Sequence, residues 1–236
     1  MSDEKTEFGP ILEGSGASDY ERYIRTDELL ALQKSADEQS HRDELLFTTV
    51  HQSSELWLKH ACFEVETATS LIREGELSGA IRLLRRAVLG LRLITDQLDM
   101  LEHMSPWEYQ EVRKVLGHGS GFDSPGFNRI KVVSPPLGEA FTQALEETGL
   151  GVVELYQRGR EFEDLYQLAE LLMDWDERVS LWRSHHFKMV ERIIGGHVIG
   201  TQGTPVELLA HLHEHVSFPA LWEARTLLTE ASKAAE

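Results

Sequence analysis

Apolar residues recur three and four positions apart along most of the chain, which is the spacing of one face of an α-helix. Residues 43–73 contain neither glycine nor proline, and we expect one long helix there that ends before Gly75. Residues 78–104 repeat the pattern, with one apolar face made of Ile81, Leu84, Val88, Leu91 and Ile94. Strand-like alternation is nearly absent. The sequence therefore predicts an all-α fold, a bundle of long antiparallel helices.

Helix-start signals divide the rest of the chain. Ser18 and Glu21 have capping-box spacing, so a helix is expected from about Asp19. A second start signal is the run SPWE at 105–108, which combines a cap, a proline and a glutamate. After the glycines of 117–122 we expect a loop to about 138, and then helices over 139–173, with a break near 149–151, and over 177–194. Residues 195–203 are a glycine-rich loop, and further helices are expected from about 204 and 219.

Residues 1–17 mix charge with glycine and proline, and we expect a flexible segment. Residues 18–236 contain no convincing boundary or repeat, so they are predicted to form a single helical domain.

Charge and composition narrow the classes of function. The chain has 236 residues and a formal charge of -17, which repels phosphate backbones and acidic lipid surfaces, so nucleic acid and membrane partners are not expected. Cys62 is the only cysteine, so no disulfide can form within the chain. No apolar run reaches membrane-spanning length and the first residues do not resemble a signal peptide. These features favour a cytoplasmic protein.

His51 is the first histidine whose position is informative. On a helix it borders an apolar face with Phe47 and Leu58, whereas Glu55 and Lys59 fall on the polar side, at ion-pair spacing. Two interpretations remain open from spacing alone. The ring is either a core histidine that bonds a backbone carbonyl, or a polar group that lines a pocket.

A second histidine pair lies at 185–186. Trp182, His186 and Met189 share one apolar seam, whereas His185 falls on the polar flank, so His186 is predicted to point inward. An inward histidine is either a core residue or a ligand of haem iron. Further along, His211 and His215 share a helix face, but no acidic residue completes a zinc motif, and we interpret the histidines of 211–215 as mostly solvated.

A series of short motifs covers most of 20–124 and 178–204: YERY at 20–23, DELLF at 43–47, HQSSELWLK at 51–59, PWEY at 106–109, SGF at 120–122, LWR at 181–183 and GT at 200–201. In their order and rough separations, these motifs resemble the tryptophan 2,3-dioxygenase family. The set is far more specific than any single motif. The resemblance implies an all-α enzyme with b-type haem and dioxygen as co-substrate.

Carried over residue by residue, the resemblance makes His186 the axial ligand of the haem iron. It makes His51 a catalytic residue on the distal side, near the indole nitrogen. It implies substrate binding by Phe47, Tyr109, Arg113, Ser120 and Thr201. Trp182, Gly121 and Phe122 are expected beside the haem. Tyr20 and Tyr23 are expected to reach the pocket of a neighbouring subunit, which implies a homo-oligomer, a tetramer or a dimer.

The implied reaction inserts dioxygen across the indole C2–C3 bond of L-tryptophan or a close derivative, giving an N-formylkynurenine. The sequence departs from the family at Arg42, where a histidine is usual, and in a shorter stretch between Phe122 and His186. An altered pocket suggests one alternative, monooxygenation of a substituted tryptophan to an oxindole-type product. The other alternative is a haem-binding helical protein without catalysis.

Overall fold

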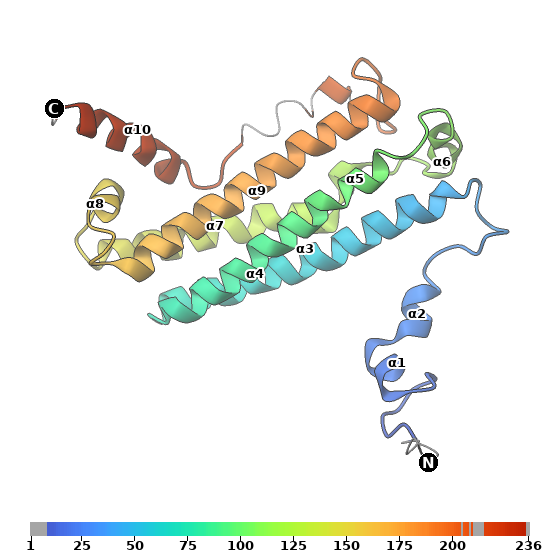
Figure 1. The fold of residues 1–236 in the computed structure, drawn as a ribbon, viewed down its shortest axis with the longest axis horizontal. Helices are drawn as coiled ribbons and strands as arrows, with labels where there is room; N and C mark the ends of the chain where they lie inside the picture. Colours follow the sequence, from blue (N-terminus) through green and yellow to red (C-terminus); the bar gives the residue numbers. More distant parts are fainter. Residues whose placement is uncertain (1–8, 204, 208, 210–214, 235–236) are drawn as a thin grey trace, which may run out of the picture.

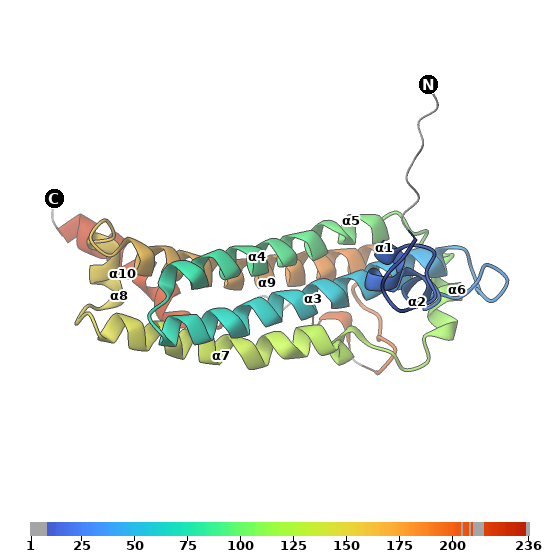
Figure 2. The same cartoon turned by 90° about the horizontal axis from the view of Figure 1, so that it is seen from below.

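The computed structural model describes residues 9–203, 205–207, 209 and 215–234. Four long helices lie side by side: α3 (Asp43–Arg73), α4 (Leu77–Asp96), α7 (Pro125–Glu146) and α9 (Glu163–Ile194) (Figures 1 and 2). Helix α3 packs against α4 and α7, and α4 also packs against α9. The predicted all-α bundle is confirmed. Helix α3 runs antiparallel to α4, and α7 antiparallel to α9, whereas α3 and α7 run parallel, as do α4 and α9 (Figures 1 and 2).

The core lies between these four helices. Its centre is a continuous cluster of mostly aliphatic side chains around Trp175, which is fully buried. The indole N–H of Trp175 donates to the hydroxyl of Ser134 at 3.0 Å, so a buried polar atom from α9 is satisfied on α7. A second, smaller cluster around Val50, Val112 and Met189 lies toward the end where α3 begins and α9 ends.

The expectation for α3 is correct at both ends, because the helix stops at Arg73 and Gly75 follows with φ of +80°. The predicted helix over 78–104 is divided instead. Helix α4 ends at Asp96, and a four-residue helix, α5 (Leu98–Leu101), follows. The short helix still buries Leu98 and Leu101, so the apolar spacing persists across the division.

The expectation of a loop from 123 to about 138 is wrong, because α7 begins at Pro125. The side chain of Ser124 accepts from the backbone N–H of Phe127, and a proline at the first position suits a helix start. Pro135 and Pro136 lie inside the helix and remove two backbone donors. Burial of α7 residues such as Leu137 against the core outweighs that loss.

The two helices expected at 139–173 and 177–194 are also wrong in their boundaries. Helix α7 stops at Glu146, and α9 runs unbroken from 163 to 194. The acidic stretch at 174–176 does not interrupt α9, because Trp175 points into the core and Asp176 accepts from the backbone N–H groups of Ser217 and Phe218 at 2.9 Å. The predicted interruption of the helix near 149–151 is confirmed, since Gly149 has φ of +74° and a new helix starts at 152.

Five further helical elements of the described part of the chain are short: α1 (Asp19–Ile24), α2 (Thr26–Leu30), α6 (Tyr109–Val115), the 3-10 turn η1 (Gly121–Asp123) and α8 (Val152–Gln157). Helix α10 (Pro219–Ala234) has 16 residues. The capping box at Ser18 is confirmed. The helix expected from 105 begins at Tyr109, after a turn. Thr204 lies outside the described residues, and its neighbour Pro205 pairs with Ile199 in an isolated β-bridge.

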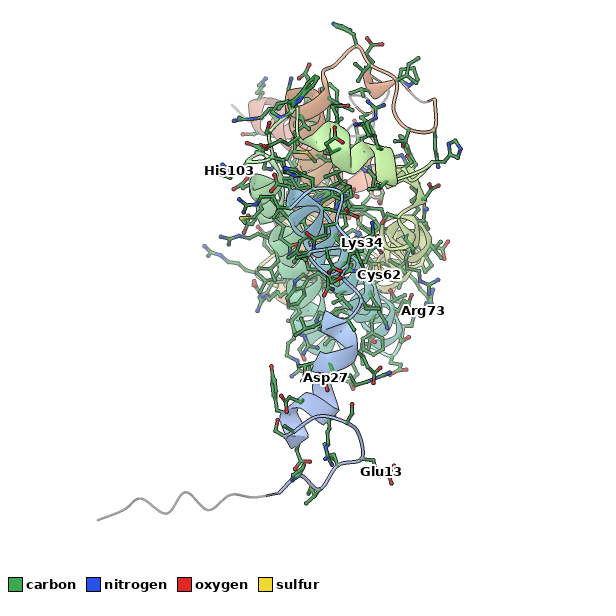
Figure 3. The ribbon with its side chains drawn as sticks, turned by 90° about the vertical axis from the view of Figure 1, so that its right-hand side faces the viewer. Glu13, Asp27, Lys34, Cys62, Arg73 and His103 are labelled. Carbon is green, nitrogen blue, oxygen red and sulfur yellow. The ribbon has the colours of Figure 1, made fainter. Side chains whose placement is uncertain are left out.

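An N-terminal arm made of residues 9–33 leaves the bundle, with Glu13 and Asp27 far from Cys62 in the core (Figure 3). Neither α1 nor α2 contains a buried residue. The segment before α1 folds back on it, because Asp19 accepts from two backbone N–H groups of that segment. Residues 1–8 of the predicted flexible segment lie outside the described residues. None of the described helices is long and apolar enough to cross a membrane.

Candidate functional site

A pocket of about 470 Å³ opens at the end of the bundle where α3 and α7 begin and α9 ends. Helix α6, the turn η1 and the glycine-rich segment after α9 complete its walls. The walls are largely apolar, with a few polar and charged groups, which is typical of a site for an organic ligand. Ten of the residues singled out in the sequence line it together: Phe47, His51, Tyr109, Arg113, Ser120, Gly121, Phe122, Trp182, His186 and Thr201.

His186 lines this pocket from α9. Trp182, one turn earlier, stacks on its ring with centroids 4.7 Å apart and planes 13° apart, and Phe127 of α7 packs on Trp182 at 3.9 Å. The pKa of His186 is lowered from 6.5 to about 4, mainly by burial and in addition by the neighbouring rings of His51 and His185. The imidazole is therefore neutral at pH 7, the form that binds a metal.

His185 turns the other way, as the helical spacing predicted. Its Nε2 lies 3.0 Å from a carboxylate oxygen of Glu102 and 3.5 Å from one of Asp99. Within the described part of the chain these three residues are the only group of acidic, histidine or cysteine side chains close enough to share a metal ion. They lie outside the pocket. Nη1 of Arg192 lies 3.6 Å from a carboxylate oxygen of Glu102, so this carboxylate has a cationic partner within the chain. His211 and His213 lie outside the described residues.

His51 combines both interpretations that its spacing left open. Its Nδ1 lies 2.7 Å from the backbone oxygen of Phe47, and the two rings are 4.0 Å apart. Because a carbonyl oxygen only accepts, Nδ1 carries the proton, and Nε2 keeps a free lone pair. The residue borders the pocket, and part of its surface is exposed to solvent. The protein atoms around the ring still desolvate it, which lowers the pKa of His51 against the opposing effects of the Phe47 carbonyl and Glu55, so the neutral form dominates at pH 7.

Glu55 is a pocket residue that the sequence analysis missed, since it was assigned to the polar side with Lys59. Its carboxylate instead accepts from the hydroxyl of Ser124 and from the backbone N–H of Gly126. A negative charge at the start of α7 is favourable there, because unpaired N–H groups make a helix N-terminus positive. The residue lies four positions after His51, and this spacing is the signal that could have placed it on the same wall.

Helix α6 contributes Tyr109 and Arg113, one turn apart. The ring of Tyr109 lies 6.1 Å from that of Phe47, and burial raises the pKa of its phenol while Arg113 opposes the rise. Nη2 of Arg113 donates to the backbone oxygen of Ile199 at 2.7 Å. A guanidinium has five N–H donors in a planar fork, so others remain for a ligand.

The two glycine-rich segments meet at the pocket. The hydroxyl of Thr201 donates to the backbone oxygen of Gly119, and Gln202 donates to Asp123 at 2.5 Å. The side chain of Ser120 accepts from the N–H of Phe122 at 3.3 Å and starts η1. These contacts hold residues 199–203 against the loop after α6, so the two segments form one wall of the site.

Tyr20 and Tyr23 do not reach this pocket within the chain. They lie on the N-terminal arm, where they are 69% and 78% exposed. Their contact with a neighbouring subunit stays a prediction.

The chain matches the family model described as tryptophan 2,3-dioxygenase over residues 7–139 and 137–228. The chain belongs to the tryptophan 2,3-dioxygenase family. A protein of that name from Caulobacter vibrioides is 33% identical over 260 aligned positions, which cover 89% of this chain and 98% of that protein. Another, from Serratia proteamaculans, is 29% identical over 96% of this chain and 99% of that protein. The resemblance inferred from the motifs is confirmed, and with it an enzyme of the haem-dependent dioxygenase type.

The expected shortening also agrees with these matches. Since 89% of 236 residues is about 210, about 50 of the 260 positions aligned with the Caulobacter protein have no residue in this chain. The tryptophan 2,3-dioxygenase model itself matches in two pieces that meet at residues 137–139, between Phe122 and His186. The roles of the individual site residues are not tested by these matches and stay predictions.

Proposed function

We propose that this protein binds b-type haem through His186 and inserts dioxygen across the indole C2–C3 bond of L-tryptophan or a close derivative, giving an N-formylkynurenine. The observation that carries this proposal is the convergence of two neutral histidines and an arginine in one apolar pocket. His51 comes from α3, Arg113 from α6 and His186 from α9, far apart in the sequence.

The residues present fit a haem group. His186 offers a neutral imidazole at the wall of a cavity whose other lining is mostly aliphatic and aromatic, which suits a porphyrin. Gly121 lies beside this ring, since a Cβ at that position would be 4.0 Å from Cε1 of His186. Trp182 stacks on His186 and would hold its orientation, while Phe122 flanks the same wall. When bound, ferrous haem supplies the site where dioxygen is activated.

The other residues serve the substrate. The planar guanidinium of Arg113 forms a bidentate ion pair with the carboxylate of the substrate, and Thr201 hydrogen-bonds the ammonium and carboxylate of the substrate. Phe47 and Tyr109 pack on the indole ring, and Ser120 lies on the same wall. Nε2 of His51 accepts the indole N–H, because its Nδ1 is held as a donor by the Phe47 carbonyl. Fixing the substrate in one orientation contributes much of the rate acceleration.

The test is turnover by the reduced haem protein with tryptophan and dioxygen, followed by absorbance and mass spectrometry of the product. We expect a product that has gained two oxygen atoms. Arg113→Ala should weaken tryptophan binding about 100-fold, because it removes a charge-assisted pair worth about 2–3 kcal/mol. Arg73→Ala, at the far exposed end of α3, is the matched control.

Three outcomes separate this proposal from its alternatives. A product with one added oxygen atom would replace dioxygenation by monooxygenation of the oxindole type. Haem binding without turnover of tryptophan or any substituted tryptophan would indicate a non-catalytic haem protein. Tryptophan affinity that is equal in Arg113→Ala and the Arg73 control would refute the role of Arg113.

We further propose a homo-oligomer, a tetramer or a dimer, in which the N-terminal arm docks on a neighbouring subunit. Helices α1 and α2 bury nothing within the chain, although the arm presents Tyr20, Tyr23 and Leu30 as exposed apolar side chains. Removal of residues 1–33 should lower the number of subunits per particle, obtained by dividing the mass from light scattering by the mass of the shortened chain. An unchanged number of subunits would contradict this assembly. A cytoplasmic location fits the single cysteine, Cys62, which is buried and free.

A further inference from the structure

The charged residues that line the pocket are mostly cationic, although the chain as a whole carries a formal charge of -17. Among the described residues, the charged side chains of the lining are Glu55, Arg113, Lys131 and Arg183. The carboxylate of Glu55 is already bonded to Ser124 and Gly126. Three cations around one apolar cavity therefore indicate a ligand set with more than one negative charge.

Two of the three cations already have a partner, one in the proposed substrate site and one within the fold. Arg113 is assigned to the carboxylate of the substrate. Nη1 of Arg183 donates to the backbone oxygen of His215 at 3.4 Å. Burial lowers the pKa of Arg183, and the negative charge of Asp176 opposes this change. Arg183 thus helps hold the segment that precedes α10 against α9.

Lys131 is different, because within the described part of the chain it forms no ion pair. Its Nζ donates to the side-chain oxygen of Asn128 at 3.0 Å, and the amide of Asn128 donates to the backbone oxygen of Phe122 at 3.1 Å. The two residues lie one turn apart on α7, so this neutral contact steadies the lysine at the pocket edge without neutralising it.

The position of Lys131 along α7 places it on the wall of His186 and not on that of Arg113. Phe127, four residues earlier on the same helix face, packs on Trp182, and Trp182 stacks on His186. Arg113 belongs to the wall of Tyr109 and Phe47. A carboxylate at the edge of a group bound by His186 would therefore meet Lys131, whereas the carboxylate of the substrate meets Arg113.

We infer that Lys131, steadied by Asn128, binds a carboxylate at the edge of this pocket, and that this carboxylate is a propionate of the haem. The inference rests on the proposed function, since it needs the haem on His186. It adds a second polar anchor to a cofactor that His186 holds at the iron. The ammonium stays partly in water, so the pair contributes a modest share of the affinity for haem.

The test compares Lys131→Gln and Lys131→Glu with Lys59→Gln, which removes the same charge from an exposed position on α3 outside the pocket. Each variant of the full-length protein is titrated with haem and with haem dimethyl ester, whose propionates are uncharged. Loss of one exposed ion pair should weaken haem binding about threefold in Lys131→Gln, and charge reversal should weaken it about tenfold. Binding of the ester should be the same in wild type, Lys131→Gln and the Lys59 control.

Equal weakening of haem and its ester, or no difference between the Lys131 variants and the Lys59 control, would overturn the inference. A tryptophan affinity that falls in Lys131→Gln while haem affinity holds would also overturn it, because the carboxylate would then belong to the substrate. Failure of the wild-type protein to bind haem at all is a different result. It would refute the proposed function itself.

Discussion

Acid should destabilise the haem-free protein through His186. The pKa of this histidine is lowered from 6.5 to about 4 by burial, so the folded state binds fewer protons than the unfolded chain between these values. Because the unfolded state gains the proton first, stability is complete above about pH 6.5 and falls as the pH drops toward 4. The full shift corresponds to about 3 kcal/mol, of which about 2 kcal/mol is lost between pH 7.5 and 5.

The measurement is urea unfolding of the haem-free protein at several pH values from 7.5 to 5, in wild type and in His186→Leu. Other groups titrate in the same range, so the informative quantity is the difference in pH dependence between the two proteins. His103→Leu removes an exposed histidine and is the matched control. We expect His186→Leu to lose about 2 kcal/mol less than wild type over this range, and His103→Leu to follow wild type. A His186→Leu protein with the wild-type pH dependence would refute the lowered pKa and the neutral state of this half-buried ring.

Two further substitutions test contacts that position the site. Gly126→Ala would place a Cβ 2.6 Å from Cβ of Leu58, so we expect a loss of about 1–3 kcal/mol in urea unfolding. Gly151→Ala is the control, because a Cβ there would make only an ordinary contact with Glu154, at 3.8 Å. Equal stability of the two variants would contradict the close approach of α7 to α3. Asp176→Asn turns one acceptor of the Ser217 N–H into a donor, so we expect the free energy of unfolding to fall by about 1–3 kcal/mol and the amide of Ser217 to exchange faster. Unchanged exchange at Ser217 would show that this carboxylate does not hold the segment.

The elements that the sequence predicted well are those whose signals are local. Helix α3 has an unbroken apolar spacing and ends at a glycine, and both bounds follow from that. The inward direction of His186 follows from its spacing relative to Trp182, without any knowledge of the neighbouring helices. The capping box at Ser18 is another local signal, since both of its hydrogen bonds lie within four residues.

The errors arise where distant contacts outweigh local preference. Pro135 and Pro136 argue against a helix by their own chemistry, yet α7 continues through them because its apolar face packs against α3. Glu55 looked like half of a surface ion pair with Lys59, and only the approach of α7 shows that Ser124 and Gly126 take its carboxylate. The convergence of α3, α6 and α9 in one pocket is likewise not encoded in any single stretch, and it was expected only through the resemblance to a family.

The shortening of the chain bears on how far the substrate pocket differs from that of longer relatives. The family match breaks at residues 137–139, whereas the last α7 residue that lines the pocket is Lys131. Six residues of helix separate the two, which is about 9 Å along the axis. At the break, Gly138 packs closely against Phe218, whose backbone is held by Asp176, so the C-terminal segment covers this point. In this chain the break therefore lies on α7 outside the pocket wall. Mutagenesis of the side chains that line the cavity tests how they determine the choice of substrate.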